Sequence, residues 1–460
     1  MQKLIEDMLA TIARLEGEVS ALTRQLERKD AQIEDLRQRL AQYEKPKKGS
    51  GNSSVPPTQD SLPDQILRHT KSLRPKSERK PGGQPGHKGH TQSINIEPTS
   101  EVSYKPCVCE CCGAPLDDAE CERVSRHLEI DYIVVPVVTA HAAYRCKCHC
   151  GHTTTARLPK DKANRSCFGP HTQATVAYLS NEQCVPYGRL RQTMRDIFGL
   201  TMSEGTIRNI LKRAGELARY PYEVIRQMVE SAKVIGGDET GVYVAGNLHW
   251  AWTFQNEGIT YIFQDSSRGI KAVNAHFPGH FPNATLVTDR HSTYLNLDVE
   301  SHQVCLAHIL RNLEYLNDLD AGQTWSGRFQ EMIRDSLDAW KDAGKRPVGQ
   351  ALAEQYRRRL DELLSETRPG EDKEFESTRK GLAKWEKHFF TFLTTEGVPP
   401  DNNGSERAIR NIKVKQKVSG AFRTNLGADI YMMLKSITET AHKNGQSKFA
   451  PLLALYSLQP

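Results

Sequence analysis

The chain has 460 residues, which is too long for one ordinary domain, so we expect several modules with enough sequence for a sizeable core. No run of eighteen apolar residues occurs, and the N-terminus shows no short apolar core followed by a cleavage site. This excludes a membrane-spanning or secreted class, and we expect a cytoplasmic protein. The 62 Lys and Arg residues against 56 Asp and Glu leave a net charge of +6, too small to indicate a partner by itself.

The distribution of charge is more informative than its sum. Residues 68–90 contain seven Lys or Arg and one acid, and residues 405–423 contain six and one. Both stretches are candidate contacts for phosphate groups, although charge runs are often only solvated faces.

Residues 1–45 carry apolar side chains at every seventh position in two seams, which predicts a coiled coil of about six heptads and therefore self-association. Lys29 interrupts the second seam, which weakens the pairing but can fix its register. A single amphipathic helix packed on the body of the protein is the alternative. The first seam comprises Ile5, Ile12, Val19, Leu26, Ile33 and Leu40, and the second Met8, Leu15, Leu22, Leu36 and Tyr43.

Residues 46–106 are rich in Pro, Gly, Ser, Lys and Arg, as in "RKPGGQPGHKGH", and show little apolar periodicity. This composition predicts a basic, mostly disordered linker. It fits a segment that wraps phosphate on binding and equally a plain tether.

Residues 107–155 contain eight of the eleven cysteines, in two groups separated by a β-branched run over 130–139. Local clustering favours metal binding over a disulfide framework. We therefore expect a small β-rich unit closed by a structural zinc ion, since four thiolates form a closed tetrahedral site. The preferred ligands are Cys109, Cys112, Cys148 and Cys150. Cys146 in place of Cys148, a contribution from Cys107 or Cys111, and free reduced cysteines are the open alternatives.

Residues 165–225 change to a helical pattern, with a break at Gly199 and Ser203 placed to cap a second helix. This predicts a helix-turn-helix region, although an ordinary helical hairpin gives the same signal. The candidate DNA contacts on the second helix are Thr206, Arg208, Asn209 and Lys212.

The stretch 233–265 has three apolar, aromatic-rich segments separated by Gly-Asn and Glu-Gly turn signals, which predicts an antiparallel three-strand meander. Asp238 lies on the first of these strands. A fourth strand candidate ends in "LVTD", with Asp289 directly after its apolar residues. Either aspartate alone would more often be a turn or capping residue, so the functional interpretation depends on the set.

A third acid, Glu406, is expected at the beginning of a helix that continues with cations at three- and four-residue steps. A carboxylate beside a row of cations suits metal and phosphate together. A glutamate favoured there by the helix dipole is the alternative. The cations expected to anchor a DNA backbone are Arg407, Arg410, Lys413 and Lys415.

The motifs "GGQPGHKGH", "GGDET", "LVTDRHSTY" and "NNGSERAIRNIKVKQK", with the coiled coil and the cysteine groups in the same order, resemble the bacterial insertion-sequence 66 family of transposases over nearly the whole chain. The resemblance implies a multidomain α/β protein whose ribonuclease H-like mixed-sheet core spans 230–440, with an α-helical insertion at 306–394 and a C-terminal segment at 441–460. It also implies that Asp238, Asp289 and Glu406 form an Asp-Asp-Glu triad.

Two details fit the family only in part. "CLAHILRNL" resembles a Cys-x-x-His element of related transposases, so we expect Cys305 and His308 to be structural or to arrange the site, and not to be metal ligands. The family more commonly has a small residue after the second Asp, where this chain has Arg290.

The implied activity is DNA strand cleavage and strand transfer at the ends of an insertion sequence by two-metal phosphoryl transfer, without a covalent protein–DNA intermediate. Carboxylate oxygens select magnesium or manganese. Asp238 would bridge two such ions, Asp289 would bind one and Glu406 the other. The implied partners are element-end and target DNA, a second copy of the chain and companion proteins of the element, with association with the bacterial nucleoid when bound to DNA. A non-catalytic, DNA-binding transposase relic and a nuclease that cuts without rejoining are the alternatives.

Overall fold

The computed structural model describes residues 2–43, 48–49, 97–116, 121–158, 168–320, 322–367 and 373–458, together with Asn52, Asp60 and Gly86. The expected linker at 46–106 therefore lies almost wholly outside the described residues. The chain divides into two compact units. The first comprises Met1–Lys71, Phe168–Pro186 and Arg208–Pro460, and the second Ser72–Cys167 and Tyr187–Ile207.

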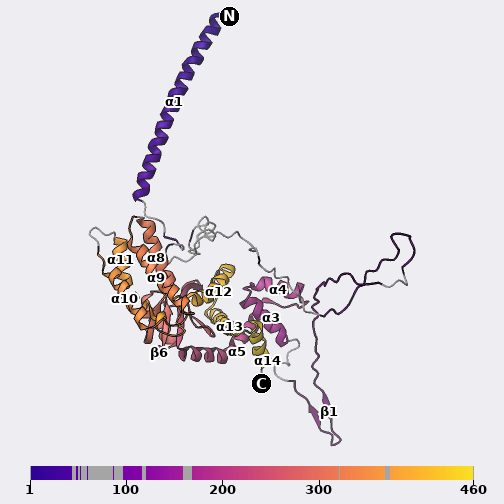
Figure 1. Ribbon diagram of the computed structural model, residues 1–460. Helices are drawn as coiled ribbons and strands as arrows, with labels where there is room; N and C mark the ends of the chain where they lie inside the picture. Colours follow the sequence, from indigo (N-terminus) through magenta and orange to yellow (C-terminus); the bar gives the residue numbers. More distant parts are fainter. Residues whose placement is uncertain are drawn as a thin grey trace. The chain divides into compact units, whose positions relative to one another are not determined.

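A five-stranded mixed sheet forms the centre of the first unit, in the order β5-β4-β3-β6-β7. Figure 1 labels its strand β6 and the helices around it. The first three strands are an antiparallel meander, and β6 and β7 extend the sheet with parallel pairing. The predicted meander and fourth strand are both confirmed. The strands are β3 (Val234–Val244), β4 (Asn247–Gln255), β5 (Thr260–Asp265), β6 (Phe281–Thr288) and β7 (Val299–Val304).

The connections between the strands follow from the backbone conformation of the turn residues and from the direction of the strands they join. Ala245 and Gly246, which join β3 to β4, both have positive φ, the conformation that matches the twist of a tight hairpin. The parallel connections need longer crossings. These contain α6 (Ile270–His276) between β5 and β6 and the short α7 (Ser292–Leu295) between β6 and β7.

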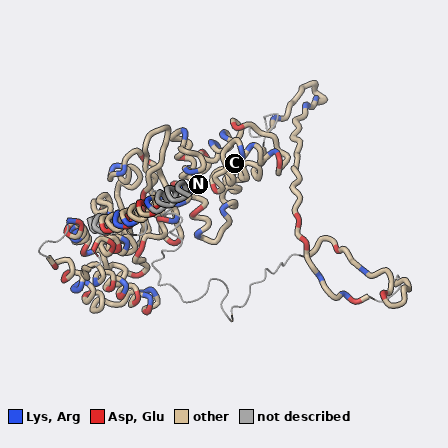
Figure 2. Tube along the Cα trace, turned by 90° about the horizontal axis from the view of Figure 1, so that it is seen from above, with Lys and Arg blue, Asp and Glu red and all other residues tan. Residues whose placement is uncertain are grey.

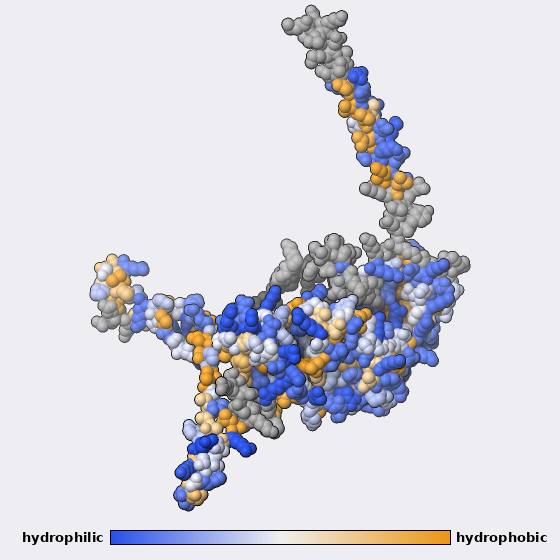
Figure 3. All heavy atoms as spheres, turned by 180° about the vertical axis from the view of Figure 1, so that it is seen from behind, coloured by the Kyte–Doolittle hydropathy of each residue, from blue (hydrophilic) through white to orange (hydrophobic). Residues whose placement is uncertain are grey.

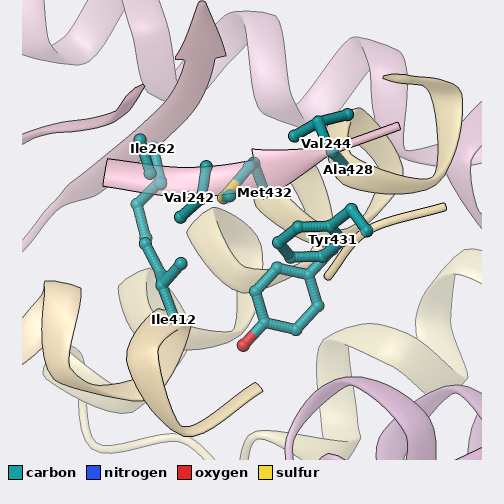
Figure 4. Packing of buried hydrophobic residues seen from close by; sticks show 9 residues of the cluster. Val242, Val244, Ile262, Ile412, Ala428, Tyr431 and Met432 are labelled. Atoms are coloured by element: carbon teal, nitrogen blue, oxygen red, sulfur yellow. The ribbon is translucent and has the colours of Figure 1, made fainter. Parts of the chain in front are cut away.

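Two long helices, α12 (Asn403–Ser419) and α13 (Asn425–Lys443), pack against one face of the meander. Successive strand residues point to opposite faces, so Val242 and Val244 of β3 lie on the same side (Figure 4). They belong to a buried cluster with Ala251, Ile262, Ile412, Phe422, Ala428, Tyr431 and Met432. Asp238 has the same parity as these valines and therefore belongs to the face that α12 covers.

A buried polar network joins α13 to α3 (Pro170–Asn181) and α14 (Phe449–Ser457). The Lys435 ammonium is 1% exposed and lies 2.7 Å from Glu182 and 2.9 Å from Glu439. Lys448 contacts both acids as well. Because each buried charge has an opposite partner, the network avoids the cost of an isolated charge.

Helices occupy the stretch where an α-helical insertion was expected. They follow β7 and return the chain to α12, passing through two short 3-10 turns at Glu386–His388 and Thr391–Leu393. Trp325, Phe329, Phe389 and Phe392 are buried among them. The helices are α8 (Leu306–Leu319), α9 (Trp325–Asp342), α10 (Gln350–Ser365) and α11 (Lys373–Ala383).

The N-terminal helix α1 (Gln2–Tyr43) is continuous over 42 residues. Acidic and basic residues are interspersed along its described part (Figure 2), where apolar side chains are also exposed (Figure 3). Side chains are described for 14–33, 35 and 36. Their exposed apolar members are Leu15, Val19, Leu22, Leu26, Ile33 and Leu36, all in the predicted seams.

The second unit holds the cysteine-rich segment, the helix α4 (Tyr187–Asp196) and a small antiparallel hairpin. The hairpin strands are β1 (Arg145–Lys147) and β2 (Thr153–Thr155). The β-branched run over 130–139 in the expected β-rich unit forms no strand: Ile133 and Val137 are 87% and 92% exposed, and no described strand pairs with it. No helix within the described ranges is long and apolar enough to cross a membrane.

Candidate active site

Asp238 and Asp289 come together through the parallel pairing of β3 and β6. The register aligns Gly236 with Val287, and two further residues along each chain bring Asp238 level with Asp289. Neighbouring strands lie about 4.8 Å apart, so the two carboxylates lie side by side at the same level of these two inner strands. Beyond this point β6 has ended, which leaves the side of β3 next to Asp238 without a paired strand.

The electrostatics confirm that several acids are close together. Burial, followed by the charges of Asp289, Glu239 and Glu406, raises the pKa of Asp238 well above its usual value. Burial and the charge of Glu239 raise the pKa of Asp289. Glu406, from a distant part of the chain, lies close enough to Asp238 for its charge to act on that carboxyl. Among the described residues, however, the ligand atoms of Asp238, Asp289 and Glu406 do not form one group within 4.8 Å of one another. This concentration of carboxylates needs protons or cations for compensation.

The glycines beside the acids permit a close approach of α12 to the sheet. A Cβ atom at Gly236 would lie within 2.8 Å of atoms of Gln255, Ser405 and Asn402. A Cβ atom at Gly404 would lie 2.6 Å from Gln255 Nε2. The motifs "GGDET" and "NNGSERAIRNIKVKQK" therefore each place a glycine where the helix that carries Glu406 contacts the strand that carries Asp238.

Asn402 fixes the beginning of α12 to the catalytic strand. Its buried side-chain amide donates to the Gly237 carbonyl at 2.6 Å and accepts from the Ser405 hydroxyl at 2.6 Å. Its backbone N–H donates to Cys305 Sγ at 3.2 Å. One residue thus connects β3, α12 and the start of α8, a role that no sequence pattern around Asn402 indicated.

Glu406 lies in the first turn of α12 and faces α8. Its Oε1 is 3.3 Å from His308 Nε2 and 3.5 Å from Arg311 Nη2. Burial, together with the charges of Arg311 and Arg290, lowers the pKa of His308 to about 3. His308 is therefore neutral at pH 7, and Arg311 is the charged partner of Glu406.

Cys305, His308 and Glu406 form a compact group whose ligand atoms lie within 4.8 Å of one another. Burial raises the pKa of the Cys305 thiol to about 12, so the sulfur is protonated at neutral pH. The adjacent guanidinium of Arg311 opposes a further positive ion. The group has the ligand types and spacing of a possible metal site, and its contacts also hold Glu406 in place, so the structural role expected for Cys305 and His308 stays a prediction.

A second acid next to Asp238 was missed by the sequence analysis. The Glu239 side chain is 1% exposed, accepts a hydrogen bond from the Tyr294 hydroxyl and lies 3.0 Å from the Arg268 guanidinium. The sequence signal for Glu239 is its position directly after Asp238 on a predicted strand. Neighbours on a strand point to opposite faces of the sheet, so the second acid has different partners from the first.

A model described as "Transposase IS66 family" matches residues 165–430. The chain belongs to the IS66 transposase family. A second model, a family of unknown function (DUF6444), matches residues 7–93. No curated protein matches the sequence.

As a member of the IS66 family, this transposase is a DNA-processing enzyme that acts in transposition. Its partner is DNA, and its activity depends on divalent metal. The matched region contains Asp238, Asp289 and Glu406 and all of the helical insertion. The three predicted acids therefore lie within the part of the chain that the family model matches.

The predicted DNA contacts of the transposase differ in their surroundings. On α12, Arg407 and Arg410 are exposed, whereas Lys413 donates to the Gly241 carbonyl and Lys415 donates to the Ser180 carbonyl at 3.2 Å. Burial lowers the pKa of both lysines. The two arginines are thus freer to meet DNA than the two lysines.

The predicted second helix of the helix-turn-helix region is the beginning of α5 (Glu204–Glu230). Ser203 Oγ accepts the Thr206 N–H at 3.1 Å, as the sequence predicted for a capping residue. Thr206 is half-buried, whereas Arg208, Asn209 and Lys212 are exposed.

The predicted zinc ligands of the transposase occupy two similar turns. The Gly113 N–H donates to the Cys109 carbonyl and the Gly151 N–H to the Cys148 carbonyl, and both glycines have positive φ. Hydrogen bonds from Cys112 and Cys150 lower the pKa of Cys109 and Cys148, respectively. Within the described ranges the two turns do not converge on one cluster of ligand atoms, so the quartet stays a prediction.

Proposed function

We propose that this transposase cleaves DNA at the ends of an insertion sequence and joins the ends to a target, using Asp238, Asp289 and Glu406 as its catalytic carboxylates. The observation that supports the proposal is the parallel register that brings Asp238 of β3 level with Asp289 at the end of β6. The charges of Asp289 and of Glu406, in the first turn of α12, both act on Asp238, although the three acids are far apart in the sequence.

The chemistry of the donor set fits magnesium or manganese. Several carboxylates with few cations between them favour hard divalent ions, and oxygen ligands select the two metals named. Two such ions would supply the positive charge that activates an attacking oxygen and stabilises the leaving oxygen. No serine or tyrosine nucleophile is required for this class of reaction.

The protein's own contribution is rigid placement. Asp238 is fixed by β3, which pairs with β4 at this residue and with β6 up to Gly236, and Asp289 by the loop in which its Oδ1 accepts the His291 N–H at 2.9 Å. Glu406 is placed by the attachment of α12 through Asn402 and by Arg311. Preorganised charge of this kind is usually the largest contribution to catalysis of phosphoryl transfer.

We further propose that DNA is bound by two basic surfaces. Arg407 and Arg410 on α12 lie within one turn of Glu406 and would anchor the backbone near the reacting phosphate. The exposed residues of α5, led by Arg208, Asn209 and Lys212, would recognise the element end as part of a helix-turn-helix region. Phosphate contacts of this type make affinity salt-dependent.

The remaining modules would support assembly. The proposed zinc ion, held by the quartet that includes Cys109 and Cys148, would stabilise the cysteine-rich unit. The proposed coiled coil of α1 would join two protomers, as synapsis of two element ends requires. Each exposed apolar seam of α1 supports this part of the proposal.

The test is cleavage and joining of a labelled element-end DNA in magnesium or manganese. Wild type is compared with Asp238→Asn, Asp289→Asn and Glu406→Gln. We expect all three variants to bind DNA normally and to lose at least about 10²-fold in rate, because each removes charge stabilisation of the transition state. Asp401→Asn is the matched control, since it removes an acid that lies near Glu406 in sequence but outside the triad.

Each outcome discriminates between functions. Cleavage by the three variants at the wild-type rate would refute the site assignment. Cleavage without joining would indicate a nuclease, and binding without cleavage by wild type a non-catalytic relic.

A further inference from the structure

Arg268 occupies an unusually well-defined loop beside the proposed triad. The loop joins β5 to α6, and the Ser267 N–H donates to Asp265 Oδ1 at 2.6 Å. The Ser267 carbonyl accepts the Trp252 indole N–H at 3.2 Å. The Arg268 carbonyl accepts the Thr293 hydroxyl at 3.3 Å, which links the loop to the segment that follows Asp289.

The Arg268 side chain is fixed as firmly as its backbone. Nε and Nη2 both lie 3.0 Å from Glu239 Oε1, and the guanidinium is stacked 4.4 Å from the centre of the Trp250 ring. Glu239 is itself held by Tyr294. These contacts leave little rotational freedom to a side chain that is normally flexible.

The guanidinium is nevertheless open to a ligand. The Arg268 side chain is 45% exposed, whereas its partner Glu239 is 1% exposed. Nη1 donates no hydrogen bond to any residue in the described part of the chain. The Thr293 hydrogen bond attaches this loop to the segment that follows Asp289, and Glu239, the partner of Arg268, comes directly after Asp238 in β3.

An arginine that only neutralised Glu239 would not need to keep donors exposed beside Asp289. A fixed guanidinium with free N–H groups is suited to the nonbridging oxygens of a phosphodiester, which it can contact in a planar, charge-assisted geometry. The same group in a flexible side chain would lose more entropy on binding.

We propose that Arg268 is a phosphate-binding residue of the active site, donating from Nη1 to a nonbridging oxygen of the DNA phosphate that reacts beside Asp289. Arg268 transfers no proton and forms no bond. It stabilises the charge that develops on the phosphoryl group, while Glu239, Tyr294 and Trp250 hold it in place. The inference rests on the proposed function, because the ligand is the substrate of that same site.

The first measurement is single-turnover cleavage of pre-bound element-end DNA by the full-length protein. We expect Arg268→Gln to slow cleavage by about 10²-fold, the usual effect of removing one oxyanion-stabilising donor, while DNA affinity changes less than about threefold. Arg268→Lys should recover only part of the rate, since an ammonium lacks the planar fork. Arg359→Gln is the matched control, because Arg359 also combines an acidic partner, Asp335, with a tyrosine ring but lies in the helical insertion.

A second comparison separates phosphate binding from a purely structural role. Arg268→Gln leaves Glu239 as a buried charge without its cation, and the double variant Arg268→Gln/Glu239→Gln removes that charge. If Arg268 only neutralised Glu239, the double variant would regain the wild-type rate and the proposal would be overturned. If Arg268 binds phosphate, the double variant stays slow.

Phosphorothioate substitution at the reacting phosphate gives a third readout. Sulfur in place of the oxygen that Arg268 contacts should slow wild type and add no further loss to Arg268→Gln. If sulfur slows wild type and Arg268→Gln by the same factor with each stereoisomer, the proposed contact between Arg268 and the nonbridging oxygen would be overturned. A wild type that does not cleave would overturn the proposed function and this inference with it, whereas a fast Arg268→Gln variant would overturn this inference alone.

Discussion

Asp238 and Glu239 are adjacent acids with different surroundings, because successive residues of a strand point to opposite faces of the sheet. Asp238 shares its face with the helix that carries Glu406, and other carboxylates are its main electrostatic neighbours. Glu239 has a cation and a hydroxyl as partners. The same carboxylate chemistry would therefore serve the proposed metal binding at Asp238, whereas at Glu239 it fixes an arginine.

The raised pKa of Asp238 leads to a prediction on stability. The charged form is disfavoured in the folded protein, so the metal-free protein loses stability as the pH rises from the ordinary value of about 4 through the raised folded value. Asp238→Asn removes this repulsion. We expect the variant to melt at a higher temperature than wild type in EDTA at pH 7.5, by about 2–4 °C for each kcal/mol of relieved repulsion.

Magnesium and acid both provide controls for this prediction. Magnesium should raise the melting temperature of wild type and have little effect on Asp238→Asn, because the metal compensates the same negative charge. Near pH 3.5 the difference between the two proteins should shrink, since the carboxyl is protonated in the folded state and largely so in the unfolded state. A variant less stable than wild type in EDTA at pH 7.5 would contradict the electrostatic account.

Secondary-structure elements were predictable where the signal was local. The meander, the strand before Asp289 and the helix at Glu406 each follow from apolar periodicity and turn residues close together in the sequence. The contacts that complete the site are not local. Asn402 meets Gly237 over 165 residues and Glu239 meets Tyr294 over 55, and no pattern in one sequence shows which distant polar residues will pair.

Helix α12 shows a second limit of sequence patterns. Its helical spacing predicted a row of cations, but spacing alone does not tell which side of the row packs on the sheet. In the structure Lys413 and Lys415 turn toward backbone carbonyls, while Arg407 and Arg410 remain exposed. The β-branched run at 130–139 shows the same limit for strands. Its residues have high strand propensity, but the run forms no sheet because no described partner strand pairs with it.

The exposed face of α12 makes a separate prediction about DNA binding. Arg407→Gln/Arg410→Gln should weaken affinity for all DNA sequences and reduce the slope of log affinity against log salt by about two, one for each lost phosphate contact. The measurement is binding to element-end and unrelated duplexes over a range of salt. Arg358→Gln, an exposed arginine of the helical insertion, is the control. An unchanged salt slope in the double variant would show that α12 does not contact DNA.

At the scale of the whole molecule, one chain supplies one triad, but joining two element ends to a target requires at least two. The structure offers a means of association in α1, whose described part exposes apolar residues at heptad spacing. Leu22 and Leu26 are 60% and 63% exposed, and pairing with a second helix would bury this apolar surface. Burial of one leucine contributes about 1.5–3 kcal/mol, and a dimer buries the same position twice.

Leu22→Lys tests whether this seam holds the protomers together. Charge in the seam should raise the dissociation constant of the wild-type oligomer by about 10²–10⁴-fold, corresponding to the loss of about 3–6 kcal/mol. Sedimentation across a concentration series measures the change. Ala21→Lys places the same charge one residue away, outside both seams, and should leave the oligomer intact. If α1 brings two active sites together, Leu22→Lys should reduce paired-end joining much more than binding of a single end, and a wild type that stays monomeric at all concentrations would exclude the coiled coil.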